Sequence, residues 1–349
     1  MKGKAEEIAG VLMQCRRVIL ASHVRPDGDG LGCMRALQLT LEQTGKTVHI
    51  LCPGGIAPKY AFLFDCQSDV LFNQKEDLSR RRELIAAADT LVVLDCSSKV
   101  QLGSDLELLD PFEGGRIMID HHPPPNSLWW DRPARPRRDI FWLDPTAGAT
   151  GVMVAELIDA MGADVTPEIT EALFVAIGTD TGWFAFPGTD ARVLDRVARL
   201  TRTGASPHDL YRRLYQSDSA ARFRLLAESL TQMELLARGR LAVQTITPQM
   251  LARTGAIPTD LENIVNEPMA MQDVIVSVLF SEREDEKGKI RVNFRSKPPV
   301  DVSAIAQQFD GGGHKRAAGA SIETDLDTAK HRVLAAIHLD ANRTGGPSA

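Results

Sequence analysis

The stretch RVILASHVRPDGDGLGCMRALQLTLEQTGKTVHILC, residues 17–52, decides the fold of the first half of the chain. The apolar, β-branched run at residues 17–22 predicts a buried strand. Residues 31–44 carry apolar side chains at helical spacing, and Gly45 follows as a typical helix stop. Residues 47–52 predict a second strand. A strand, a helix and another strand in this order are typical of a parallel α/β unit.

The same alternation continues to about residue 190. Residues 77–88 predict a helix, and the short runs LVVLD at 91–95 and IMID at 117–120 predict two more strands. Short apolar strands between helices indicate a parallel sheet that is covered on both faces. We therefore expect residues 1–190 to form a doubly wound α/β domain.

The second half of the chain has a different organisation. Residues 191–236 are almost entirely helical in pattern, which predicts a helical connector. Beyond it, strands are expected at residues 240–247, 273–282 and 289–296, and helices at residues 302–309 and 328–338. Residues 237–349 should therefore form a smaller α+β domain.

Length and charge limit the class of protein. The chain has 349 residues, which fits two domains, and 46 acidic against 40 basic side chains leave a net charge of −6. Proteins that coat long duplex nucleic acid are usually basic, so we expect no such partner. We also expect no membrane partner, because no apolar run approaches the roughly 18 residues that a membrane span needs. The five cysteines form no C-x-x-C pair and indicate reduced thiols in a cytoplasmic protein.

Ionisable side chains gather where the predicted strands end. Ligands of open parallel sheets bind beyond the carboxyl ends of the strands, so these side chains should share one site. Asp120 ends the strand at 117–120, and His121 and His122 follow it directly. Asp180 follows another apolar run. The candidate metal ligands are His23, Asp27, Asp29, Asp95, His121 and Asp180.

Four carboxylates and two imidazoles in one place would repel one another unless cations lie between them. Carboxylates with a minority of imidazoles favour Mn²⁺, with Mg²⁺ or Co²⁺ as alternatives. Six ligands exceed the need of one four-coordinate ion, so we expect two divalent ions about 3.5–4 Å apart with a bridging aspartate. Such a pair acidifies a shared water and neutralises a phosphate under attack. The alternative to a metal-ligand role is that a single residue, such as Asp29, only caps the helix at 31–44.

Taken together, these motifs resemble those of the DHH phosphoesterases. The resemblance is carried by SHVRPDGDGLG at 22–32, VVLDCSS at 92–98, DHH at 120–122 and GTDTGWF at 178–184. It implies an α/β domain, a linker and a smaller C-terminal domain, and two divalent metals, commonly Mn²⁺. It also implies that the six candidates are the ligands, with Asp95 and Asp180 as bridges. His122 would contact the substrate phosphate, and Asp120 would support the site by hydrogen bonding.

A glycine-rich string in the second domain, FDGGGHKRAAG at 309–319, indicates an anion site. Successive glycines let the backbone approach a ligand and turn its N–H groups toward an anion. We expect a short helix to follow them, and the simplest alternative is a flexible loop. The string resembles the C-terminal domain that accompanies DHH domains, which implies substrate binding by Arg295, Gly311, Gly312, Gly313, His314 and Arg316.

Within this family, the two-domain chain most resembles the bifunctional oligoribonucleases that also act on 3′-phosphoadenosine 5′-phosphate. The implied substrates are short single-stranded RNA, dinucleotides such as pApA, and that nucleotide bisphosphate. A net charge of −6 leaves no extended basic track for a long strand, which also favours short substrates. The alternatives are a soluble cyclic-di-AMP phosphodiesterase, a RecJ-like single-strand exonuclease and a catalytically silent nucleotide-binding protein. A homodimer stays open.

Overall fold

The computed structural model divides the chain into two compact units, Met1–Ser217 and Asp218–Ala349. Each unit has its own sheet and its own apolar core. The structure describes residues 2–24, 26–52, 54–64, 70–72, 78–103, 106–124, 139–282, 288–337 and 339. Among these residues, no helix is both long enough and apolar enough to cross a membrane.

The first unit is built on a parallel sheet whose described strands lie in the order β3-β2-β1-β4-β5-β6. Every neighbouring pair is parallel. The order reverses between β1 and β4, and ligands of open α/β sheets bind at such a switch point. The strands are β1 (Arg17–Ala21), β2 (Thr47–Cys52), β3 (Val70–Phe72), β4 (Thr90–Leu94), β5 (Gly115–Asp120) and β6 (Asp139–Leu143).

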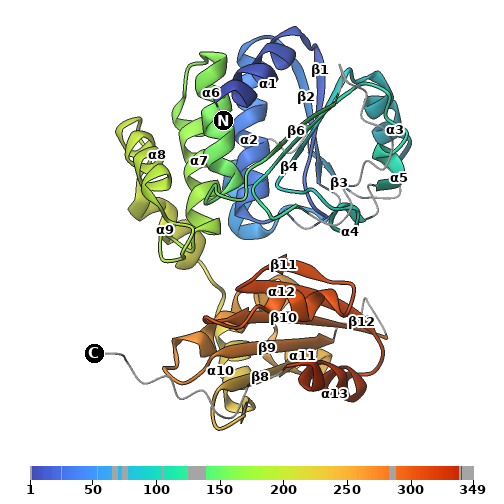
Figure 1. The fold of residues 1–349 in the computed structure, drawn as a ribbon, viewed down its shortest axis with the longest axis vertical. Coiled ribbons are helices and arrows are strands. Elements are labelled where there is room, and N and C mark those ends of the chain that lie inside the picture. Colours follow the sequence, from blue (N-terminus) through green and yellow to red (C-terminus); the bar gives the residue numbers. More distant parts are fainter. Residues whose placement is uncertain are drawn as a thin grey trace. The chain divides into compact units, whose positions relative to one another are not determined.

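Helices cover both faces of this sheet, so the predicted doubly wound domain is confirmed (Figure 1). Val18 and Leu20 of β1 point into one core, and Ile19 and Ala21 point into the other. The first core is covered by α1 (Lys2–Gln14), α2 (Gly28–Gln43), α6 (Thr150–Met161) and α7 (Pro167–Asp180). The second is covered by α3 (Leu78–Ala87), α4 (Lys99–Leu102) and α5 (Leu106–Leu109), while the 3-10 helix η1 (Pro58–Leu63) packs on the first.

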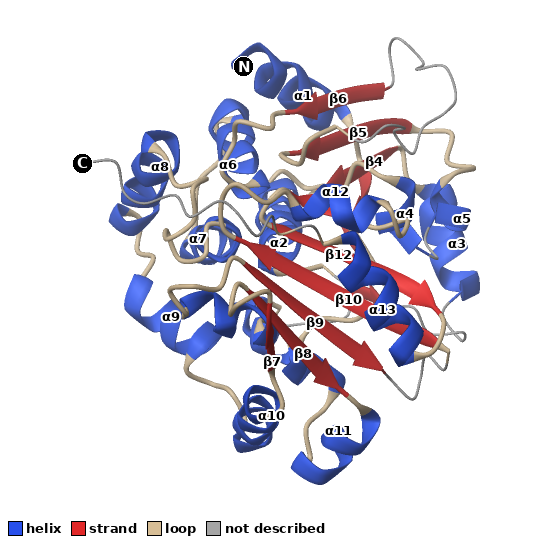
Figure 2. Cartoon of the chain, turned by 60° about the horizontal axis from the view of Figure 1, so that its bottom comes forward, coloured by secondary structure: helices blue, strands red, loops and turns tan. Residues whose placement is uncertain are grey.

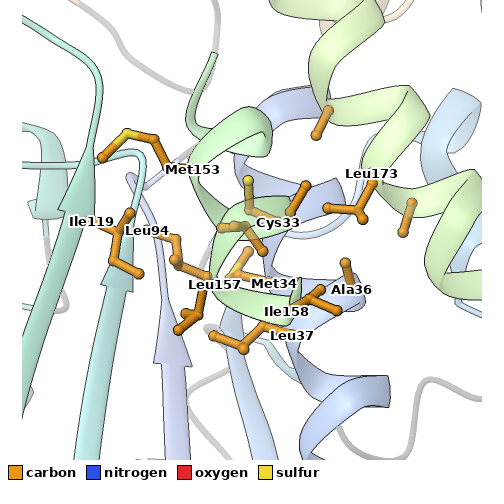
Figure 3. Close-up of a cluster of buried hydrophobic side chains, with 14 of the residues drawn as sticks. Cys33, Met34, Ala36, Leu37, Leu94, Ile119, Met153, Leu157, Ile158 and Leu173 are labelled. Carbon is orange, nitrogen blue, oxygen red and sulfur yellow. The ribbon is translucent and has the colours of Figure 1, made fainter. Parts of the chain in front are cut away.

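The first core of this unit packs against the ends of β4 and β5. Figure 3 shows Leu94 of β4 and Ile119 of β5 beside Met34 and Leu37 of α2 and Leu157 of α6. All five side chains are fully buried. Each such side chain contributes about 1.5–3 kcal/mol to folding through the apolar surface it removes from water. This packing holds the ends of β4 and β5 against the helices that carry further candidate site residues.

The start of α2 differs from the prediction for a local reason. The helix begins at Gly28 rather than at residue 31. The Asp27 carboxylate accepts hydrogen bonds from the N–H groups of Asp29 (3.0 Å) and Gly30 (3.3 Å). Asp27 is therefore the helix cap, and Asp29, the cap considered from the sequence, lies inside the first turn.

Three helices occupy the predicted connector at residues 191–236. α8 (Ala191–Arg202) and α9 (Pro207–Tyr215) fall in the first unit, where Val193 and Leu200 join its core. α10 (Ala220–Thr231) falls in the second unit. The stretch ends in a short strand, β7 (Glu234–Leu236), because these residues pair with β8. The role of residues 191–236 as a connector stays a prediction.

The second unit is an α+β domain, as expected, with described strands in the order β11-β12-β10-β9-β8-β7 (β11 is labelled in Figure 1, and β12, β10, β9, β8 and β7 in Figure 2). β8 and β9 are parallel, and the other pairs are antiparallel. The strands after β7 are β8 (Leu241–Ile246), β9 (Val276–Glu282), β10 (Lys289–Ser296), β11 (Gly312–His314) and β12 (Ala317–Glu323). α12 (Val302–Gln307) and α13 (Leu326–Ala336) cover one face. The other face carries α10, α11 (Pro248–Thr254), η5 (Pro258–Leu261) and η6 (Ile264–Ala270).

The prediction of a short helix after the three glycines is wrong. Gly312–His314 form strand β11, which pairs with residues 317–319 of β12. The helical segment of this region, α12, comes before the glycines and ends at Gln307. The glycines continue into a tight hairpin because β12 returns after a two-residue turn at 315–316.

Candidate metal centre

The turn between β1 and α2, together with the first turn of α2, provides the first three candidate ligands. His23 follows β1, and its Nε2 atom lies 3.7 Å from Oδ2 of Asp95 and 4.0 Å from Oδ1 of Asp27. Asp27, the helix cap, keeps half of its side chain exposed. Asp29 is fully buried. Capping of α2 thus holds one carboxylate at the surface and directs another into the interior.

Asp95 follows β4 at the centre of the group. Its side chain is buried, and its backbone N–H donates to the carbonyl of Ile119 in β5 at 2.9 Å. Its φ is 56°, in the left-handed region that residues other than glycine seldom adopt, although aspartate tolerates it better than most. Backbone strain of this kind concentrates at functional positions.

His121 is held by a backbone carbonyl. Its Nδ1 atom lies 3.1 Å from the carbonyl oxygen of Ala147, which can only accept, so Nδ1 carries the proton. This tautomer leaves Nε2 as the ligand atom. Nε2 faces three carboxylate oxygens, at 3.3 Å from Asp180, 3.8 Å from Asp95 and 3.9 Å from Asp29.

Asp120 and His122 form a hydrogen-bonded pair beside these residues. Oδ1 of Asp120 accepts from the backbone N–H of His122 at 3.0 Å and lies 2.8 Å from its Nδ1. Burial raises the pKa of Asp120, but the hydrogen bond from His122 outweighs it and lowers the pKa to about 2. Burial likewise lowers the pKa of His122, and the bond to Asp120 raises it to about 9. His122 is therefore a cationic donor at neutral pH.

Asp180 comes from a helix rather than from a strand. It is the last residue of α7, and the apolar run before it is buried against the sheet. Its side chain is 22% exposed, more than those of Asp29 and Asp95. The six predicted ligands thus come together at the switch point of the first sheet.

The ligand atoms form two groups. One group joins His23, Asp27 and Asp95, and the other joins Asp29, His121 and Asp180, with the ligand atoms of each group within 4.8 Å of one another. Asp95 lies between the groups, because its Oδ2 faces His23 at 3.7 Å and its Oδ1 faces His121 at 3.8 Å. This arrangement could hold two cations that share one carboxylate.

The electrostatics of the cluster favour cation binding. Burial raises the pKa values of Asp29 and Asp95 well above the ordinary range, and neighbouring carboxylates raise them further. Burial also raises the pKa of Asp180. A divalent cation would offset this repulsion. Cys33 adds no thiolate, since burial raises its pKa well above the ordinary range and its Sγ donates to Asp29 at 3.3 Å, so the donor set fits Mn²⁺ or Mg²⁺.

Thr150, the first residue of α6, was not predicted from the sequence as a site residue. Its N–H donates to Asp29 at 2.7 Å, and its hydroxyl donates to Asp95 at 3.0 Å. The string GATG at 148–151 contains no ionisable residue and therefore does not indicate a site motif. Its small residues just before an apolar helical pattern are the only local signal.

The glycine string of the second unit has a structural explanation at two of its positions. A side-chain carbon on Gly311 would lie 2.2 Å from the carbonyl oxygen of Gly319, and one on Gly313 would lie 2.5 Å from that of Ala317. Close approach of β12 therefore requires glycine at both. Gly312 is exposed and has open space around it. His314, also in β11, is partly buried.

The two candidate arginines of this unit are partly buried. Arg295 lies on β10, between β9 and β12, and its Nη1 donates to the carbonyl of Phe294 at 2.9 Å. Burial lowers the pKa of Arg295, because a desolvated guanidinium is costly to keep charged. Arg316 donates to the carbonyl of Val300. These residues lie in a different unit from every candidate metal ligand.

Comparison with known proteins now places the chain. Residues 17–179 match the N-terminal domain of the DHH family. The chain is 31% identical over 330 residues to the bifunctional oligoribonuclease and PAP phosphatase NrnA of Thermus thermophilus, covering 94% of this chain and 91% of that protein. The chain belongs to the DHH family. The resemblance inferred from the sequence motifs is confirmed.

Further comparisons cover the second unit and the fold of the chain. Residues 239–339 match the DHHA1 domain, and NrnA of Bacillus subtilis is 27% identical, covering 87% of this chain and 89% of that protein. The crystal structure of an exopolyphosphatase-related protein from Bacteroides fragilis shares the fold, with a TM-score of 0.84 at 24% identity over 96% of each chain. RecJ of Thermus thermophilus, solved with Mn²⁺, has a TM-score of 0.55 at 16% identity, covering 99% of this chain and 55% of that one.

Proposed function

We propose that this chain is a two-metal phosphodiesterase that hydrolyses short oligoribonucleotides and dinucleotides and removes phosphate from 3′-phosphoadenosine 5′-phosphate. The observation that carries the proposal is the position of Asp95, whose two oxygens face two separate groups of ligands at 3.7 and 3.8 Å. Membership of the DHH family supports phosphoester hydrolysis, and the names of its NrnA relatives support these substrates.

The first cation would be held by His23, Asp27 and Asp95, and the second by Asp29, His121, Asp180 and Asp95, while the further bridge expected from Asp180 stays a prediction. Mn²⁺ is the metal we expect, with Mg²⁺ or Co²⁺ as alternatives. When bound, such a pair supplies an acidified water as nucleophile and neutralises the charge of the phosphate. Backbone N–H groups fix the orientation of both oxygens of Asp29, and a bound cation would offset the burial and the carboxylate repulsion that raise its pKa.

His122 would act on the substrate rather than on the metals. Because the bond to Asp120 raises its pKa to about 9, His122 carries a positive charge at neutral pH. A cationic donor beside the ligand cluster can hold a phosphate oxygen as negative charge develops, and it can pass a proton to the leaving oxygen. Asp120 keeps the imidazole oriented for either role.

The second unit would bind the part of the substrate that does not react. Arg295 is a partly desolvated cation, for which a phosphate is a favourable partner. Gly312 offers an exposed backbone beside His314, and Arg316 adds a second guanidinium. We assign substrate binding to Arg295, the glycines 311–313, His314 and Arg316. We also propose a cytoplasmic location, which the five cysteines without a C-x-x-C pair support.

The test is a panel of substrates with Mn²⁺: pApA, 3′-phosphoadenosine 5′-phosphate, cyclic-di-AMP, and 5′-phosphorylated RNA from two to twenty nucleotides. We expect kcat/KM to fall beyond about five nucleotides, because a net charge of −6 provides no long basic track for the backbone. Light scattering of the same preparation decides whether the chain forms a homodimer.

Each alternative has its own outcome in this panel. Efficiency that stays flat or rises up to twenty nucleotides would indicate a RecJ-like exonuclease. Preferred turnover of cyclic-di-AMP would indicate a cyclic dinucleotide phosphodiesterase. Nucleotide binding without turnover of any substrate in Mn²⁺, Mg²⁺ or Co²⁺ would contradict the proposal and indicate a silent binding protein.

A further inference from the structure

Thr150 contacts carboxylates that belong to both groups of candidate ligands. Its backbone N–H donates to Oδ2 of Asp29 at 2.7 Å, and its hydroxyl donates to Oδ1 of Asp95 at 3.0 Å. The N–H of Gly151 donates to the other oxygen of Asp29 at 2.8 Å. Thr150 is fully buried, so water does not compete for these hydrogen bonds.

The contact with Asp29 follows from the way α6 begins. Ala149 precedes the helix and provides no side-chain cap. The first N–H groups of a helix have no partner within it, and they favour a negative charge. Asp29, which comes from α2, fills this position from outside, and both of its oxygens are thereby fixed in orientation.

The turn that leads into Thr150 also orients His121. The carbonyl of Ala147 in this turn receives Nδ1 of His121 at 3.1 Å. Asp144, where the turn begins, accepts from the hydroxyl of Thr146 at 2.6 Å and from Arg192 of α8 at 2.7 Å. Arg192, which lies outside the site, therefore helps to hold this turn in place. The turn contacts His121, a ligand of the second group, and leads into Thr150, which contacts the shared Asp95.

We propose that Thr150 is a positioning residue that holds Asp29 and Asp95 at the spacing required by a pair of metal ions. The inference rests on the proposed function, because it assumes that Asp95 is shared between two ions. The hydroxyl bond to Oδ1 fixes the rotation of the Asp95 carboxylate, and this rotation decides whether its two oxygens face both groups. Loss of hydrogen bonds behind metal ligands typically lowers metal affinity about 10–100-fold.

The test compares three variants. Thr150→Val keeps the shape and the backbone N–H but removes the hydroxyl, and Thr150→Ser keeps the hydroxyl. Thr170→Val is the matched control, since Thr170 is also fully buried and its hydroxyl lies 3.1 Å from that of Thr203. Thr170 is near the start of α7, about 15 Å along the helix from Asp180.

The readouts are calorimetric titration of the metal-free protein with Mn²⁺ and the electron paramagnetic resonance spectrum of the loaded protein. We expect Thr150→Val to weaken at least one Mn²⁺ site about 10–100-fold and to reduce the spin coupling of the pair. Thr150→Ser and Thr170→Val should keep the wild-type Mn²⁺ affinity and the wild-type spin coupling. Should Thr150→Val not fold, Thr150→Ala removes the same hydroxyl.

Two results would overturn the inference while leaving the proposed function intact. One is unchanged Mn²⁺ binding and spin coupling in the Thr150 variants that lack the hydroxyl. The other is equal weakening in Thr170→Val, which would indicate a general loss of stability. A wild-type protein that binds no coupled pair of Mn²⁺ ions would instead overturn the proposed function itself, and this inference with it.

Discussion

Among single residues, Asp95 has the greatest consequence for the proposed chemistry. Asp95→Asn should keep the fold, because asparagine tolerates a φ of 56° about as well as aspartate does. It removes the charge shared between the two groups, so we expect loss of at least one metal and a rate loss of well over 10²-fold. Elemental analysis of the loaded protein and turnover of pApA measure both.

Asp164→Asn is the matched control for this substitution, since Asp164 is an exposed carboxylate in the loop between α6 and α7. It should retain full metal content and full turnover. Asp95→Asn with two metals per chain and near-normal turnover would show that Asp95 is not a bridge.

The Asp120–His122 pair predicts a pH dependence. The bond to Asp120 raises the pKa of His122, so a step that needs the imidazolium is lost as the pH rises through this raised pKa. Asp120→Asn removes the charge that raises this pKa. We therefore expect the alkaline limb of kcat against pH to move to lower pH, and an unmoved limb would exclude His122 as the titrating donor.

At the scale of elements, the strands are held at the end opposite to the site by a buried ion pair. Arg116 of β5 donates to both oxygens of Asp139 in β6, at 2.9 and 2.6 Å, and both side chains are almost completely buried. Asp120 lies at the other end of β5, about 13 Å away. The pair therefore contributes to stability but does not contact the proposed metals.

Asp139→Ala should lower the free energy of unfolding by about 3 kcal/mol, because it removes the carboxylate that compensates a buried guanidinium. Urea unfolding of the metal-free protein measures this loss. Glu7→Ala is the control, since the Lys4–Glu7 pair is about half exposed and should contribute less than about 1 kcal/mol. A cost for Asp139→Ala as small as that of the control would contradict the assignment.

The elements also show which parts of the site could be predicted from sequence. His23, Asp95 and Asp120 directly follow or end apolar strand runs, and parallel strands bring such positions to one edge. Thr150 could not be predicted, because its contacts depend on how α6 meets α2 and its side chain is not ionisable. The packing of β12 against Gly311 and Gly313 could not be predicted, since sequence does not distinguish the approach of a ligand from the approach of a strand.

At the scale of the whole molecule, the proposed chemistry and the proposed substrate binding belong to separate units. Arg295→Ala, in the second unit, should therefore raise KM for pApA while leaving metal content unchanged. Its effect on bis(p-nitrophenyl) phosphate, which has no second nucleotide to bind, should be much smaller. Equal losses on both substrates would contradict this division of roles.

The most direct test of the paired metal site is anomalous diffraction at the manganese edge from crystals of the Mn²⁺-loaded protein. We predict two anomalous peaks about 3.5–4 Å apart at the ends of β1, β4 and β5, with one oxygen of Asp95 bound to each. A single peak, or two peaks of which only one contacts Asp95, would contradict the account.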